Sequence, residues 1–276
     1  MVPEIILNNG VKIPSLGLGT YQLRGKNVER VVSYALDVGY RHIDTAMAYT
    51  NEKRIGTILQ QNDVPRADIF ITTKLWNIDH GYEAALKAIE TSLQKLSLDY
   101  VDLYLIHWPV EGFIETWGAM EEILASGKAR AIGVSNFMIP HLEKLLATTK
   151  VVPFVNQIEC TPYLHSREIL EYCKKRGITI TASSPLTRGT KLDDPRLINI
   201  ASNYGKSPAQ ILIRWGIQHG LVEIPKSTQE HRIKENIQVF DFMISKKDMK
   251  ELDGFNEDLR VHGSSVHKKL AEKYLG

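Results

Sequence analysis

The sequence predicts an α/β fold, a (β/α)8 TIM barrel with an N-terminal β-hairpin, built as one domain over residues 1–276. Strand-like and helix-like segments alternate without a break, and the strand-like segments are short and almost continuously apolar. Such strands are typical of a parallel sheet that is covered by helices. Eight strand–helix units in a chain of 276 residues favour a closed barrel. An open, doubly wound sheet is the alternative.

The hairpin is expected first, because residues 4–7 and 11–13 flank a turn of Asn8, Asn9 and Gly10, residue types that accept a tight turn. Gly177 stands where a helix is expected to stop. The strands are predicted over residues 16–19, 41–44, 69–74, 101–106, 129–135, 154–159, 178–183 and 221–224. The helices are predicted over residues 27–38, 52–59, 82–96, 116–124, 141–147, 169–176, 195–203 and 208–218, with a further helix in the tail, residues 261–276.

Composition excludes several classes of function. Hydrophobic residues make up 43% and charged residues 24%, and the formal net charge is +2, so nothing points to nucleic acid or an anionic membrane as a partner. Cys160 and Cys173 are too few for a disulfide framework. The N-terminus lacks the features of a signal peptide, and no apolar run is long enough to span a membrane. We expect a cytoplasmic protein, and a monomer.

Two glycine-containing motifs fail as nucleotide-binding signatures. Gly17 and Gly19 follow a strand, but Gln22 occupies the position of the third glycine in a Rossmann fingerprint. The sequence Gly205-Lys206-Ser207 resembles the end of a phosphate loop, yet Ile200 replaces its leading glycine, and the stretch lies between two predicted helices. The nine histidines form no spacing typical of a metal site.

Four residues point to catalysis: Asp44, Tyr49, Lys74 and His107. Three of them fall at or just after the ends of predicted strands, and Tyr49 lies in the loop that follows Asp44. Barrel enzymes place their chemistry at these strand ends. An ammonium beside a phenol lowers the pKa of the phenol, and a neighbouring carboxylate keeps the ammonium charged. The set therefore predicts a general acid, although each residue by itself also has a structural explanation, such as a helix cap or a buried ion pair.

Three further stretches are spread along the chain. They read Gly39-Tyr40-Arg41-His42-Ile43-Asp44-Thr45-Ala46, followed by Tyr49, Glu52 and Gly56; Ile132-Gly133-Val134-Ser135-Asn136-Phe137; and Ile224-Pro225-Lys226-Ser227-Thr228, followed by Arg232, Glu235 and Asn236. Together with Lys74 and His107, these stretches resemble the signatures of the aldo-keto reductases. Within that family the chain is similar to the microbial 2,5-diketo-gluconate and methylglyoxal reductases.

The resemblance implies NADPH-dependent reduction of small-molecule aldehydes and ketones to alcohols. Tyr49 would be the general acid, Lys74 and Asp44 would lower its pKa, and His107 would position the substrate carbonyl. The implied cofactor-binding residues are Gly19, Thr20, Ser135, Asn136, Gln157, Ser183, Ser184, Leu186, Lys226, Ser227, Thr228, Arg232, Glu235 and Asn236. The implied substrate pocket consists of Tyr21, Trp76, His107 and Trp108, although Tyr21, Trp76 and Trp108 could instead plug the barrel mouth.

The chain departs from the family pattern at three places. Ser183 stands where the family usually stacks an aromatic ring on the nicotinamide. The segments after Pro109 and Leu186 are short where many relatives carry long loops. The tail does not resemble the usual specificity loop. Two other functions stay open: a Schiff-base lyase with Lys74 as nucleophile, and a cofactor-sensing binding protein.

Overall fold

The computed structural model of the chain describes residues 2–261. Strands β1 (Glu4–Ile6) and β2 (Lys12–Pro14) form the predicted antiparallel hairpin, with Ile5 opposite Ile13. The other eight strands are parallel and are hydrogen-bonded in chain order. They are β3 (Leu18–Gly19), β4 (His42–Asp44), β5 (Phe70–Leu75), β6 (Val101–Ile106), β7 (Ala129–Ser135), β8 (Val155–Glu159), β9 (Thr179–Ser183) and β10 (Val222–Glu223).

The sheet closes on itself where β10 meets the segment that leads into β3. Leu16 forms a parallel bridge with Glu223, and the Gly17 N–H donates to the Glu223 carbonyl at 2.8 Å. Gly19 is needed here, because a Cβ atom at this position would lie 2.7 Å from the carbonyl oxygen of Ile224. The closed barrel is therefore confirmed over the open doubly wound sheet.

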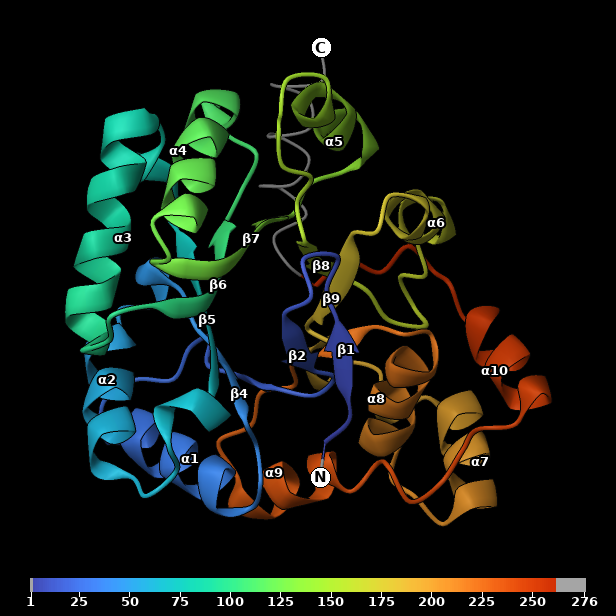
Figure 1. Cartoon of the computed structure of the whole chain (residues 1–276). Helices are drawn as coiled ribbons and strands as arrows, with labels where there is room; N and C mark the ends of the chain where they lie inside the picture. The colour runs from blue at the N-terminus through green and yellow to red at the C-terminus, as the bar shows by residue number, and fades with distance from the viewer. Residues whose placement is uncertain (1, 262–276) are drawn as a thin grey trace.

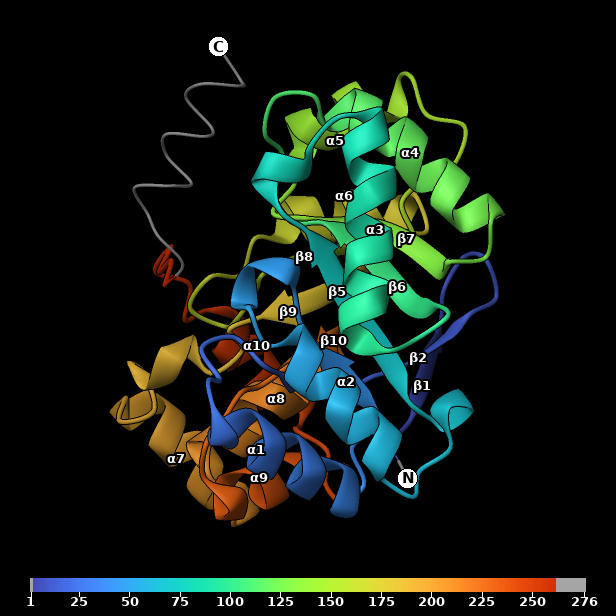
Figure 2. The same ribbon diagram turned by 90° about the vertical axis from the view of Figure 1, so that its left-hand side faces the viewer.

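Helices surround the barrel, as Figure 1 shows with the strands at the centre and as Figure 2 shows for α1 to α4 from the side. They are α1 (Lys26–Asp37), α2 (Glu52–Gln61), α3 (Tyr82–Leu96), α4 (Phe113–Ala125), α5 (Ile139–Leu146), α6 (Arg167–Lys175), α7 (Pro195–Tyr204), α8 (Pro208–Gln218), α9 (Glu230–Ile237) and α10 (Lys246–Asp253). The predicted helices all form, with ends that move by up to three residues. The predicted tail helix falls almost entirely on residues outside those described.

Helix α9 lies outside the predicted helix ranges, and helix α10 was not predicted from the sequence at all. Most of its residues are charged, and of its eight residues only Leu252 is buried. One buried and one partly buried apolar residue, Leu252 and Met249, leave too little helical periodicity to detect. The helix is instead placed by polar contacts, including the Ser245 hydroxyl, which caps it by accepting from the Asp248 N–H at 3.1 Å.

The hairpin covers the end of the barrel where the strands begin. Leu7 and Ile13 are buried, and the Asn9 side chain donates to the carbonyl of Arg130, which lies at the start of β7, at 2.9 Å. The hairpin thus closes the N-terminal end. The C-terminal strand ends form the opposite mouth, which is the end that barrel enzymes use.

Candidate active site

Adjacent parallel strands bring the predicted catalytic residues together. Asp44 is the last residue of β4, Lys74 is the next-to-last residue of β5, and His107 directly follows β6. Tyr49 ends the short 3-10 helix η1 (Met47–Tyr49), and Thr50, with a φ of 58°, turns the chain there. The strand order and the turn therefore place all four residues at the same mouth.

Lys74 and Asp44 form a fully buried ion pair. The Lys74 Nζ donates to the Asp44 Oδ1 at 2.6 Å and to the Thr45 carbonyl at 2.8 Å. The Gln157 side chain donates to the other Asp44 oxygen at 2.7 Å. Burial lowers the pKa of Lys74, and the carboxylate of Asp44 opposes that shift. The contacts hold both groups rigidly, as expected for a buried charge that needs several partners.

Tyr49 lies over this pair and lines the main cavity. The Lys74 Nζ is 5.2 Å from the centre of its ring. The pKa of Tyr49 is nevertheless raised, first by burial and then by the negative charge of Asp44. Burial thus outweighs the lowering expected from Lys74, and Asp44 offsets part of the charge of the ammonium at hydrogen-bonding distance. Tyr49 holds its proton firmly.

Aromatic rings enclose Tyr49 from several sides. The Tyr49 ring is 5.1 Å from that of Tyr21 and 5.7 Å from that of His107. Trp76 meets His107 edge-on at 5.2 Å, and Trp108 is stacked on His107 at 6.4 Å. Tyr21 and His107 thus flank the phenol, and Trp76 and Trp108 pack on His107; of the four residues predicted as the substrate pocket, only Tyr21 also lines the main cavity. The Asn136 side chain donates to the His107 carbonyl at 2.9 Å.

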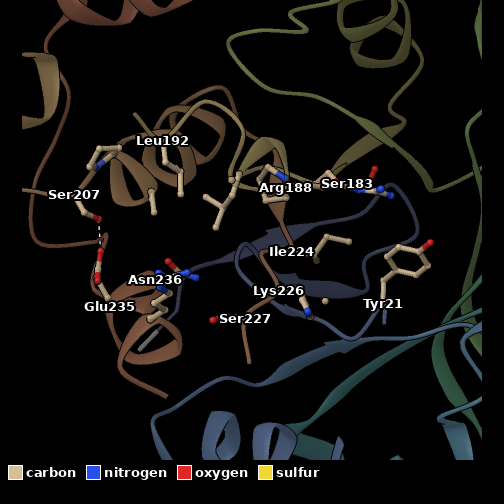
Figure 3. Close-up of a pocket in the computed structure, with 18 of the residues that line it drawn as sticks. Tyr21, Ser183, Arg188, Leu192, Ser207, Ile224, Lys226, Ser227, Glu235 and Asn236 are labelled. Atoms are coloured by element: carbon tan, nitrogen blue, oxygen red, sulfur yellow. Dashed lines mark hydrogen bonds between the residues drawn. The ribbon is translucent and has the colours of Figure 1, made fainter. Parts of the chain in front are cut away.

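A cavity of about 700 Å³ opens beside Tyr49. Figure 3 shows Arg188 and Leu192 along one side, with Lys226, Glu235 and Asn236 along the other. The predicted cofactor-binding residues that line it are Gly19, Thr20, Gln157, Ser183, Ser184, Leu186, Lys226, Ser227, Arg232, Glu235 and Asn236. Residues from the first to the last strand thus meet in one cavity.

Three predicted cofactor-binding residues do not line this cavity. Ser135 and Asn136 lie behind Gln157, where the Ser135 hydroxyl donates to the Gln157 carbonyl at 2.9 Å. Thr228 faces elsewhere, and its carbonyl accepts from Arg30 at 2.7 Å. The structure therefore gives these residues a supporting position rather than a place on the cavity wall.

Other lining residues were missed by the sequence reasoning, among them Arg188, Leu192, Lys206 and Ser207. Lys206 and Ser207 belong to the motif that failed as a phosphate loop, and they do lie between helices α7 and α8. The Ser207 hydroxyl donates to Glu235, which is 28 residues away in sequence. The motif was a usable signal, but only the packing of α8 beside α9 brings it to the cavity.

The chain was compared with known proteins. The model of the aldo/keto reductase family matches residues 15–257. The chain belongs to the aldo/keto reductase family. It is 48% identical over 257 residues to the glyoxal reductase of Bacillus subtilis, which covers 92% of this chain and 93% of that relative.

Two solved structures share the fold. An aldo/keto reductase of Brucella melitensis has a TM-score of 0.90 and 46% identity, and the match covers 93% of this chain and 100% of that one. An aldo-keto reductase of Bombyx mori in complex with NADP has a TM-score of 0.91 and 37% identity, with 97% of both chains covered. The protein is accordingly an NAD(P)H-dependent oxidoreductase. Within residues 2–261, every helix is too short or too polar to cross a membrane.

The cavity fits an anionic dinucleotide. Its volume of about 700 Å³ is in the range of small-molecule and cofactor sites. Lys226 and Arg232 contribute two cations to its lining, and Ser227 contributes a hydroxyl. Burial lowers the pKa of Lys226, which an anion beside the ammonium would counteract. Gly19 and Ile224 both line the cavity, and the close approach of their backbones there requires glycine at position 19.

Proposed function

We propose that the protein reduces aldehydes and ketones to alcohols with NADPH, and that Tyr49 donates the proton. The observation that carries this proposal is the buried Lys74–Asp44 pair beneath a tyrosine that lines the cavity. A nicotinamide cofactor, when bound, supplies the hydride. The chain supplies the position of the substrate and the proton.

Tyr49 is suited to giving up a proton only when negative charge develops in front of it. Its raised pKa keeps the phenol protonated across the physiological range. As the carbonyl oxygen becomes negative, proton transfer to it becomes favourable, and the Lys74 ammonium under the ring stabilises the phenolate that remains. His107, whose carbonyl accepts from Asn136 and whose ring lies 5.7 Å from that of Tyr49, would orient the substrate oxygen.

A Schiff-base lyase is disfavoured by the position of Lys74. A nucleophilic lysine must be reachable and must lose its proton. The Lys74 side chain is fully buried, does not line the cavity, and gives two hydrogen bonds to Asp44 and Thr45. Borohydride treatment in the presence of an aldehyde should therefore leave Lys74 unmodified.

The decisive experiment is an initial-rate screen of NADPH oxidation against aldehydes, diketones and sugars. Substrate-dependent loss of nicotinamide absorbance is expected. A protein that binds NADPH but shows no loss with any carbonyl would instead be a cofactor-sensing binding protein, and the proposal would fail.

The substrates are proposed to be small aldehydes and dicarbonyls. The connection between β6 and α4 spans only residues 107–112, and the loop after β9 contains the short 3-10 helix η4 (Thr187–Gly189). Such short connections leave a small substrate largely uncovered, which favours a broad range with weak affinity. The similarity to a glyoxal reductase supports the dicarbonyls. A strong preference for one bulky, steroid-like ketone would contradict this assignment.

We propose that Lys226, Ser227 and Arg232 hold the 2′-phosphate of NADPH. A hydrogen bond to a charged group contributes roughly 1.5–3 kcal/mol, so one such contact implies about a tenfold or greater preference over NADH. Titration of both cofactors into the parent and into Arg232→Ala tests this, with Lys234→Ala as the control, because Lys234 is an exposed residue of α9 that does not line the cavity. Equal affinities in the parent, or an unchanged ratio in Arg232→Ala, would remove the assignment.

A further inference from the structure

Two histidines and an aspartate meet on the outside of the barrel, away from the proposed active site. His165 lies in the loop between β8 and α6, His219 directly follows α8, and Asp253 is the last residue of α10. Each offers one donor atom, and these atoms lie within 4.8 Å of one another. None of the three lines the cavity beside Tyr49. Their meeting depends on three segments that are far apart in the sequence.

The distances converge on one carboxylate oxygen. The His219 Nε2 lies 2.9 Å from the Asp253 Oδ1, and the His165 Nδ1 lies 3.7 Å from the same oxygen. In a tetrahedral zinc site with bonds of about 2.0–2.1 Å, neighbouring ligand atoms are about 3.3 Å apart. The two observed distances bracket that value, and the separation of the two histidine donor atoms is at most 4.8 Å.

His165 directs a nitrogen without a hydrogen-bond partner toward the Asp253 carboxylate. Its side chain is 5% exposed, and its Nδ1 atom is buried and makes no hydrogen bond. A buried polar atom without a partner is unusual in a folded protein and calls for an explanation such as a bound ion.

Trp215 holds the aspartate in place. Its indole N–H donates to the Asp253 Oδ1 at 2.8 Å, and its ring meets His165 edge-on at 5.1 Å. Metal-binding carboxylates are commonly oriented by such an additional hydrogen bond. Arg167 opposes a cation here, because its guanidinium is 3.9 Å from the Asp253 Oδ2, but its side chain is 63% exposed and can turn toward solvent.

A second cavity gives access to the cluster. It has a volume of about 600 Å³, and His165, His219 and Asp253 line it together with Ile6 from the hairpin. An ion can enter from this side, and water can occupy a fourth coordination position. Three protein ligands with one open position is a known arrangement for zinc.

We propose that His165, His219 and Asp253 bind a divalent transition-metal ion, with Zn²⁺ as the representative case. Two imidazoles and one carboxylate suit Zn²⁺, Co²⁺ or Ni²⁺ and do not suit Mg²⁺, which prefers six oxygen ligands. The ion would connect α10 to the loop after β8. The loop after β8 already contacts the segment that follows α10, since the Glu257 and Leu259 N–H groups both donate to the carbonyl of Tyr163 in that loop. Binding should therefore stabilise the C-terminal part of the described chain against the barrel.

The test is calorimetric titration of the full-length, tag-free protein with zinc chloride in a buffer that does not chelate metal. One equivalent of Zn²⁺ should bind, and Mg²⁺ should give no heat. His219→Ala and Asp253→Asn should each weaken zinc binding by about tenfold or more, a size typical of a disturbed coordination sphere. His231→Ala is the matched control, because His231 is an exposed histidine of α9 outside the cluster.

Thermal unfolding gives an independent measurement. Zinc should raise the unfolding temperature of the parent and of His231→Ala, and should leave that of Asp253→Asn unchanged. Circular dichroism identifies any variant that fails to fold, and the remaining variant then decides the outcome. Absence of stoichiometric binding in the parent, or equal zinc affinity in the folded cluster variants and the control, would overturn the proposal.

Discussion

At the N-terminal end of the barrel, the buried Asp102 is paired with Arg66 and Arg130, each at 2.8 Å, and both arginine side chains reach solvent. At the C-terminal end, Asp44 is paired with Lys74, and both of these side chains are buried. Both ends bury a carboxylate, but only the N-terminal pairs can be hydrated if one partner is lost. A sealed pair, meaning an ion pair with both side chains buried, has a high desolvation cost, and loss of one partner is strongly destabilising. Such a pair also holds a cation in a fixed position, where it can stabilise negative charge that develops in a reaction.

The backbone shows the same contrast. Turns that lead into strands at the N-terminal end mostly use glycine at positive φ, at Gly39, Gly127 and Gly177, with Ser97 before β6 as an exception. At the C-terminal end, non-glycine residues adopt positive φ, including Asn136 after β7 and Ser184 after β9. This backbone costs a non-glycine residue free energy and is found preferentially at functional sites. The mouth of the barrel therefore uses non-glycine residues at more of its positive-φ positions than the opposite end does, although its loops also contain glycines at positive φ, such as Gly81, Gly112 and Gly189.

The largest expected effect at the sealed end is that of Lys74→Met. Asp44 would remain buried without its cation, so the free energy of unfolding should fall by about 3–5 kcal/mol, and turnover should fall as well. Denaturant unfolding and NADPH oxidation measure the two effects. Lys128→Met is the control, because Lys128 pairs with Glu90 on the surface, and should change stability by less than about 1 kcal/mol. Equal effects of the two variants would end the contrast between sealed and exposed pairs.

Tyr49→Phe should lower turnover by about 10²–10⁴-fold, the usual contribution of general acid catalysis. The ring is kept, so NADPH affinity and stability should change little. Tyr100→Phe is the matched variant at the other end, where the Arg66 guanidinium packs on the Tyr100 ring at 4.4 Å, and it should leave turnover unchanged. Carbonyl reduction near the parental rate in Tyr49→Phe would show that Tyr49 is not the acid.

Acid should destabilise the protein partly through His42, which is buried at the start of β4. Burial lowers the pKa of His42 from 6.5 to about 4. Between these two pH values the folded state binds fewer protons than the unfolded state. The contribution of neutral His42 to the free energy of unfolding is therefore present above pH 6.5 and is lost as the pH falls toward 4. The loss is of order 3 kcal/mol for the shift. Unfolding measured from pH 7 to pH 4 should show a shallower decline in His42→Gln, and an unchanged slope would exclude this histidine as the cause.

Asp102→Asn should have the smallest effect of the four. Hydrogen bonds from Arg66, Arg130 and the Ile71 N–H lose a charged acceptor. Because both arginines can be hydrated, we expect a loss of about 1–2 kcal/mol in stability and no change in turnover. Asp44→Asn is the matched substitution at the catalytic end and should reduce turnover strongly. A comparable loss of turnover in Asp102→Asn would show that the two ends are not separable.

The sequence alone determined the order of the elements and the meeting of Asp44, Lys74 and His107. Strands with continuous apolar residues and amphipathic helices are visible as local periodicity, and helices α3 and α8 were predicted with the bounds that the structure has. Once a parallel barrel is inferred, residues at neighbouring strand ends must lie side by side. The family resemblance then placed residues of the cavity wall as far apart in sequence as Gly19 and Asn236.

Tertiary structure alone decided the direction of the Tyr49 pKa, the place of Lys206 and Ser207 in the cavity, and the meeting of His165 with Asp253. Each depends on distances between segments that local patterns do not encode. A pKa reflects the sum of burial and all nearby charges, so the presence of a lysine beside a tyrosine does not fix its sign. Helix α10 is held by polar contacts and a single buried leucine, and its position became visible only once the barrel that it packs against was in place.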